Sequence, residues 1–173
     1  MKTLVLTAQP LDPDTSDRGD LTVRPLPKAA DPAQAVRDGF IRGADIVALA
    51  DVPLEAAELR TGLEALVESD AVAWLDPRPL GPSKTVLRLR EQLVPPHVAA
   101  VAVRKHAWDA IGNHARSGRV RSVVVEVAVR VARAGLDVRY LDAAASPGWS
   151  VREGTDVLWG WLVGHRADRA SSR

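Results

Sequence analysis

Asp51 directly follows a short apolar run, Ile46 to Ala50, in this chain of 173 residues. Such a run is typical of a buried strand, and a carboxylate at a strand end can hold a divalent cation. Because Val52 and Pro53 come next, Asp51 stands alone, and a single carboxylate is a poor cation site. The same aspartate, just before a proline, is also typical of a turn or of a helix N-cap. The sequence leaves both interpretations open.

Glu126 is a second candidate, because it is the carboxylate inside the valine-rich run Val123 to Arg133. A carboxylate that reaches a hydroxyl group can remove its proton as a general base. Glu126 also lies four residues before Arg130, and on a helix this spacing describes a solvated ion pair worth a few tenths of a kcal/mol. Here too the catalytic and the structural interpretation both stand.

Three arginines gather in the segment from Asn113 to Arg121, which contains glycine and serine and which we predict to be a loop. Guanidinium groups bind phosphate oxygens through charge-assisted hydrogen bonds, so Arg116, Arg119 and Arg121 could hold a diphosphate. A solvated loop is the alternative.

The histidines lack the spacing of metal ligands, and we expect ordinary surface or capping roles for His97, His106, His114 and His165. We expect Trp159 and Trp161 to seal the core or an interface. The chain contains no G-x-S-x-G, P-loop or G-x-G-x-x-G phrase.

The composition excludes several classes of protein. The chain has 23 basic and 22 acidic residues, and its net charge of +1 argues against a nucleic-acid partner. It has no cysteine, which excludes disulfides and thiolate chemistry. No stretch approaches the ~20 apolar residues of a membrane-spanning helix. The apolar run at the N-terminus is too short for a signal peptide, so we expect no transmembrane segment and a cytoplasmic location.

Strand-like runs alternate with helical patterns along the chain. This alternation predicts a single-domain α/β fold, Rossmann-like, with a mostly parallel or mixed sheet flanked by helices. We expect the domain to span residues 1–145, and residues 146–173 to form an extension that packs on it and ends in a polar tail. The central strands are predicted at Lys2 to Thr7, Ile46 to Ala50 and Val98 to Val103, because their unbroken apolar character suits strands covered on both faces.

The run Val123 to Arg133 gives conflicting signals. Its valines alternate as in a strand, but Ser122 as an N-cap and Gly135 just after the end are typical of a helix. We predict a helix. We also predict an apolar helix from Leu54 to about Glu68.

Three segments carry a longer pattern: AQAVRDGFIRGADIVALAD (residues 33–51, followed by the apolar helix), VAVRKHAWDAIG (101–112) and VEVAVRVARAGLDVRYL (125–141). This pattern resembles the family 2 glycosyltransferases of GT-A fold, which use nucleotide-sugar donors. In that family an Asp-x-Asp motif at a strand end holds a divalent cation, Mg²⁺ or Mn²⁺, on the donor diphosphate. A Glu-Asp pair that opens a later helix supplies the general base.

The resemblance implies that Asp51 holds the metal or the diphosphate, that Glu126 replaces the base, and that the arginine segment closes over phosphate. The chain departs from the family where the second aspartate is missing and where the Glu-Asp positions fall on Val123 and Val124. The loop from Gln9 to Asp20, with its aspartates, lies where nucleotide contacts would be expected.

Three functions therefore remain open. The first is a glycosyltransferase-like protein that transfers a sugar from a nucleotide sugar to an unknown acceptor, with reduced or lost activity. The second is a non-catalytic GT-A-like module that binds a partner protein. The third is a ligand-binding α/β domain whose likeness to glycosyltransferases is accidental. The sequence does not determine the oligomeric state.

Overall fold

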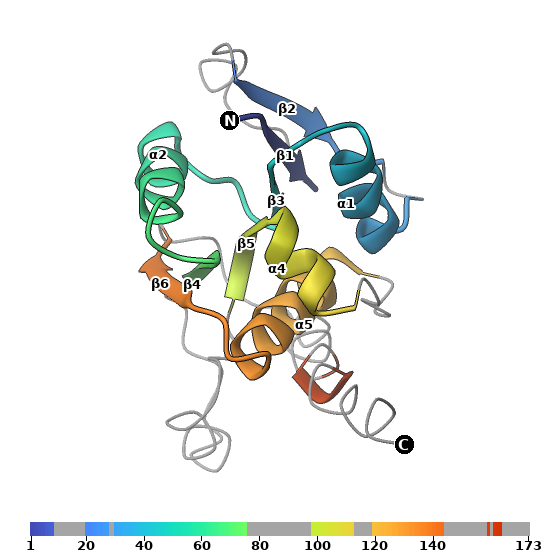
Figure 1. Cartoon of the computed structure of the whole chain (residues 1–173). Helices are drawn as coiled ribbons and strands as arrows, with labels where there is room; N and C mark the ends of the chain where they lie inside the picture. Colours follow the sequence, from blue (N-terminus) through green and yellow to red (C-terminus); the bar gives the residue numbers. More distant parts are fainter. Residues whose placement is uncertain are drawn as a thin grey trace, which may run out of the picture.

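The computed structural model describes residues 1–8, 20–27, 30–75, 98–112, 119–143, 159 and 161–163. Its strands are β1 (Thr3–Thr7), β2 (Leu21–Pro25), β3 (Ile46–Ala50), β4 (Ala71–Leu75), β5 (Val98–Arg104) and β6 (Val138–Asp142). Its helices are α1 (Pro32–Ile41), α2 (Ala56–Ala65), α4 (Lys105–Ala110) and α5 (Val120–Arg133). Figure 1 shows the sheet between these helices.

The six strands form one mixed sheet in the order β2-β1-β3-β5-β4-β6. Strands β1, β2 and β3 are parallel, as are β4 and β6, whereas β5 is antiparallel to both of its neighbours, β3 and β4. The predicted fold class is confirmed at the level of architecture: the described residues form an α/β fold with one mixed sheet flanked by helices. The three strands predicted to be central, β1, β3 and β5, do lie inside the sheet.

Alternate residues of each strand point to opposite faces of the sheet. Helices cover both faces, so each face has its own hydrophobic core. On β3, Val47 and Leu49 belong to a core shared with α1, α4 and α5. Ile46, Ala48 and Ala50 belong to a second core, which α2 closes through Leu59 and other apolar residues. All five residues of β3 are at most 1% exposed, which explains why this strand carries no polar side chain. The result is a three-layer structure (Figure 1).

Helix α5 is the most deeply buried helix among the described elements, with every residue from Arg121 to Val131 buried. Burial of its valines, about 1.5 kcal/mol or more for each, outweighs their lower helix propensity. The helix prediction for this run is confirmed, and Gly135 follows its end with a φ of +74°. This left-handed conformation favours glycine.

Several local predictions need correction. Helix α5 begins at Val120 with Arg119 as its N-cap, so Ser122 is not the N-cap and Arg121 is helical rather than part of a loop. The extra turn is held by a tertiary contact of Arg121 described below. Asp51 is not the N-cap of α2 either, because Glu55 has that position, and its amide donates to Glu58 Oε2 at 2.7 Å.

The C-terminal segment is described at residues 159 and 161–163, which are helical. Trp161 packs against the core that contains α5, as predicted, whereas Trp159 is 53% exposed. The predicted extension of residues 146–173 lies otherwise outside the described residues. Within the described part of the chain, no helix is long and apolar enough to cross a membrane.

Candidate functional site

The sheet topology places Asp51 at a position that favours ligand binding. From β1 the sheet extends to β2 on one side and to β3 on the other, and the register aligns Thr7 with both Pro25 and Ala50. In open α/β sheets, ligands bind outside the carboxyl ends of the strands, where the strand order reverses in this way. We call this side, where β1, β2 and β3 end, the carboxyl edge. Asp51 is the first residue after β3 at that edge.

Asp51 forms an ion pair with Arg121, which comes from the first turn of α5. Arg121 Nε donates to Asp51 Oδ2 at 2.5 Å, across 70 positions of sequence. The arginine side chain is 3% exposed and the aspartate side chain 22% exposed. A buried guanidinium needs a partner of opposite charge, and breaking such a pair by removing one partner costs about 3–5 kcal/mol. The pair therefore fixes the start of α5 against the end of β3.

The first turn of α5 brings the partial positive charge of a helix N-terminus to the carboxyl edge. Arg119, the N-cap, is exposed, and its side chain makes no capping hydrogen bond to the helix. The first turn contains no acidic residue. A helix N-terminus carries about half a positive charge, and its amide groups favour an anion. Asp51 and Arg121 pair with each other beside this helix end, and Arg119 lies next to them in the sequence of α5.

Glu126 lies elsewhere on the same helix, five residues after Arg121 and therefore about 7.5 Å farther along the axis. Its side chain has no exposed surface, and Oε1 lies 2.7 Å from Arg130 Nη2. The pair is therefore buried, and the interpretation as a solvated surface pair is wrong. The valines before and after Glu126 in α5 are buried as well, so other parts of the chain cover this stretch of the helix. A general base must reach its substrate proton within hydrogen-bond distance, and this carboxylate is closed off from solvent.

The structure brings together two of the predicted site residues, Asp51 and Arg121, and places Arg119 at the adjoining helix end. Arg116 lies outside the described residues, as do the aspartates of the N-terminal loop: Asp12, Asp14 and Asp17. Sequence reasoning missed the pairing of Asp51 with Arg121. The position of Arg121 just before the valine-rich run was the one available signal, because a charged residue beside buried positions needs a partner.

The described residues at the carboxyl edge do not fit a divalent cation. No group of three or more acidic or histidine side chains in the described ranges could hold a metal ion. The carboxylate predicted as a ligand, Asp51, already accepts a hydrogen bond from a guanidinium. Cations such as Mg²⁺ prefer several oxygen ligands in a near-ideal shell.

The opposite edge of the sheet holds a cavity of about 460 Å³. It is lined by Met1, Asp45, Ile46, Arg104, Lys105, His106 and Asp109, and none of the predicted site residues that the structure describes is among them. Three of the lining side chains form ion pairs with nearby residues. Lys105 pairs with Asp109 at 2.5 Å, and His106 Nε2 lies 2.7 Å from Asp70 Oδ1. We call this side the amino edge.

Asp70 connects four elements at the amino edge. Besides His106 it accepts a hydrogen bond from the backbone amide of Asp137, and its own carbonyl accepts one from Arg104. The hydrogen bond from His106 and the one from Asp137 lower the pKa of the Asp70 carboxyl below its usual value, against a smaller opposing effect of burial. The arrangement is that of a structural junction between β4, β5, β6 and α4.

No protein-family model and no curated protein matches this sequence. Among solved structures, the chain is similar to a proposed nucleotide-diphospho-sugar transferase from Desulfovibrio desulfuricans G20. The two are 19% identical with a TM-score of 0.37, and the match covers 88% of this chain. The chain spans 57% of the length of that transferase.

Proposed function

We propose that this chain is a glycosyltransferase-like module that binds a nucleotide sugar, through its nucleoside diphosphate part, at the carboxyl edge of β1 and β3. The observation that carries the proposal is the ion pair between Asp51 and Arg121, which sets the start of α5 at the point where the strand order reverses. The diphosphate would lie against the first turn of α5 and accept hydrogen bonds from Arg119. Arg116 belongs to the same proposed contact.

The chemistry of this corner supports binding more than it supports sugar transfer. Glu126, the carboxylate that would act as the base, is buried against Arg130, and Asp51 is held by Arg121. Without a carboxylate that contacts the acceptor, the hydroxyl group has no proton acceptor among the described residues. We therefore propose that transfer activity is reduced or lost.

A partner-binding module is the second candidate function. It is favoured by the same observation, because two charged pairs occupy the positions of the expected metal ligand and base, and no evident catalytic group remains among the described residues at these positions. In that case α5 and its flanking helices serve as a scaffold, and no nucleotide occupies the carboxyl edge.

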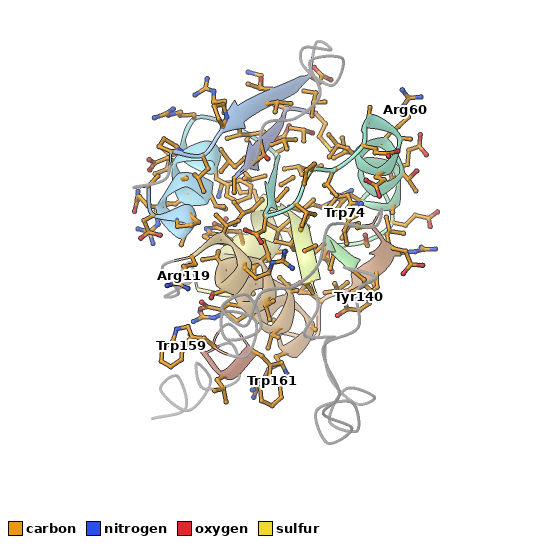
Figure 2. The ribbon with its side chains drawn as sticks, turned by 180° about the vertical axis from the view of Figure 1, so that it is seen from behind. Arg60, Trp74, Arg119, Tyr140, Trp159 and Trp161 are labelled. Carbon is orange, nitrogen blue, oxygen red and sulfur yellow. The ribbon has the colours of Figure 1, made fainter. Side chains whose placement is uncertain are left out.

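Isothermal titration calorimetry with UDP-, GDP- and TDP-sugars separates the two candidates. We expect binding of at least one nucleotide sugar, weakened about tenfold to a hundredfold by Arg119→Ala, since a charge-assisted hydrogen bond contributes about 1.5–3 kcal/mol. Arg60→Ala is the matched control, because Arg60 is also exposed and Figure 2 shows it on the opposite side of the molecule from Arg119. Binding that is absent for every nucleotide sugar would favour the partner-binding module.

A further inference from the structure

The amino-edge cavity is lined by two side chains of opposite charge, Arg104 and Asp45, that form no ion pair with each other or with any other described residue. The remaining charged groups of the lining do have partners: Lys105 pairs with Asp109, His106 with Asp70, and the amino group of Met1 with Asp20. The cavity volume of about 460 Å³ is in the range of small-molecule sites. The cavity therefore offers a small ligand one cation and one anion.

Arg104 ends β5, and its guanidinium is anchored by a backbone group. Nη2 donates to the carbonyl of Leu66, the C-cap of α2, whereas Nε is buried without a hydrogen-bond partner. Asp70 is close enough for Arg104 to contribute to its lowered pKa, but that carboxylate is hydrogen-bonded to His106 and to the amide of Asp137. A neutral carbonyl leaves the charge of a partly buried guanidinium unbalanced. Arg104 therefore favours an added anion, and a carboxylate matches its donor geometry.

Asp45 lies just before β3 and is exposed. Its Oδ2 accepts a hydrogen bond from the amide of Lys2 at 2.8 Å, which fixes the carboxylate beside the start of β1. An ionised carboxylate has about four acceptor sites, so Asp45 can also accept a hydrogen bond from an ammonium group. Because Asp45 is anchored at β1 and Arg104 at the end of α2, the two charges are held apart instead of pairing with each other.

We infer that the amino-edge cavity binds a small zwitterion, whose carboxylate contacts Arg104 and whose ammonium group contacts Asp45. Since the two protein charges are held apart, the charges of the ligand are separated by several bonds, as in an ω-amino acid. A ligand of one sign would pair with one side chain and leave the other without a partner. A nucleoside diphosphate has no ammonium group and brings negative charge towards Asp45. The inference is therefore independent of the proposed function at the carboxyl edge.

A ¹⁵N-labelled sample of the full chain tests the inference by titration at neutral pH and constant ionic strength. The probes are 4-aminobutyrate, butyrate and butylamine, which are similar in size and carry both charges, the negative charge alone and the positive charge alone. We expect 4-aminobutyrate to shift the amides of residues 45, 46, 104–106 and 109 and to bind at least about tenfold more tightly than either other probe. Glycine and 6-aminohexanoate extend the series, and glycine should bind the most weakly of the three zwitterions because its charges are closest together.

Two variants assign the contacts, each checked for folding by circular dichroism. In Asp45→Asn the amide oxygen can still accept the hydrogen bond from Lys2, but 4-aminobutyrate should bind no more tightly than butyrate. In Arg104→Gln it should bind no more tightly than butylamine, and where this variant is unstable Asp45→Asn carries the test. Glu64→Gln is the matched control, because Glu64 is an exposed carboxylate of α2 that does not line the cavity, and its Kd should stay within about twofold of the wild type.

Three results would overturn the inference. The first is equal affinity of the wild type for 4-aminobutyrate and butyrate, or no amide shift at the amino edge with any probe up to about 50 mM. The second is an Asp45→Asn protein that still prefers 4-aminobutyrate to butyrate. The third is an equal loss of affinity in Glu64→Gln and Asp45→Asn, which would indicate a general effect of surface charge. All three leave the proposed nucleotide site untouched, because they concern the other edge of the sheet.

Discussion

Glu126 and Arg130 form an ion pair one turn apart inside α5, with 2.7 Å between Oε1 and Nη2 and the glutamate fully buried. Arg130 Nη1 also lies 3.5 Å from the carbonyl of Ile111, at the end of α4, whereas its Nε is buried with no hydrogen-bond partner. The pair therefore links α5 to α4 in an apolar layer. Because the buried Nε of Arg130 has no hydrogen-bond partner, burying the charges at these two positions is costly.

The first prediction concerns this pair. Glu126→Ala should lower the free energy of unfolding by about 3–5 kcal/mol, because it leaves the Arg130 guanidinium buried without a partner of opposite charge. Urea denaturation followed by circular dichroism measures the effect. The double variant Glu126→Leu with Arg130→Met is the control, and it should be close to wild type or more stable. A loss below about 1 kcal/mol for Glu126→Ala would mean that the pair is hydrated in solution.

The second prediction concerns Gly62 on α2, which packs directly against Trp74 of β4. A Cβ atom at position 62 would lie 2.0 Å from Cζ2 of the fully buried indole, closer than two atoms can approach. We expect Gly62→Ala to destabilise the protein by about 1–3 kcal/mol or more despite the better helix propensity of alanine. The same substitution in a Trp74→Leu background should cost much less. Equal costs in both backgrounds would show that the indole is not the obstacle.

The third prediction concerns acid stability at the amino edge. The hydrogen bonds from His106 and from the Asp137 amide lower the pKa of Asp70 in the folded protein. A lowered folded pKa stabilises the protein above the unfolded value of about 3.9, and this stabilisation is lost as the pH falls through the folded pKa. Unfolding curves between neutral pH and pH 3 should therefore show a smaller acid-induced loss for Asp70→Asn than for the wild type. Parallel losses in the two proteins would argue against the Asp70 junction.

The fourth prediction uses Tyr140, which is the single tyrosine of the chain. Burial, with a further contribution from Asp137, raises the pKa of Tyr140 from its usual 10.0 to about 12. The raised folded pKa means that Tyr140 contributes stability below pH 10, which is lost as the pH rises towards 12. Absorbance of tyrosinate should appear near pH 12 in the folded protein and near pH 10 in urea. Coincident titrations would place the phenol in solvent.

Strong local signals made much of the fold predictable. The unbroken apolar run from Ile46 to Ala50 predicted a central strand with its exact bounds, because a strand covered on both faces has no polar position. Gly135 indicated the end of α5 correctly, since its positive φ favours glycine. The start of α5 was missed because Ser122 looks like an N-cap locally, whereas the tertiary pair of Arg121 with Asp51 extends the helix beyond it.

The candidate site was less predictable than the fold. Asp51, Arg119 and Arg121 stand out by residue type, but the pair between Asp51 and Arg121 joins residues 70 positions apart, and no local pattern encodes such a contact. Glu126 is buried because other elements pack on α5, and its spacing to Arg130 carries no information about that packing. From the spacing alone, the pair looked like a surface pair. The antiparallel direction of β5 likewise depends on the packing of the whole sheet.

The most direct test of the account is the location of the bound nucleotide, because the carboxyl and amino edges lie at opposite ends of the strands. An ¹⁵N-labelled sample titrated with UDP or GDP in EDTA reports the amides that change environment. We predict shifts at Asp51 and through the first turn of α5, from Arg119 to Ser122, with Arg104 to Asp109 at the amino-edge cavity unaffected. Shifts concentrated around Arg104 to Asp109, with the first turn of α5 unchanged, would contradict a nucleotide site at the carboxyl edge.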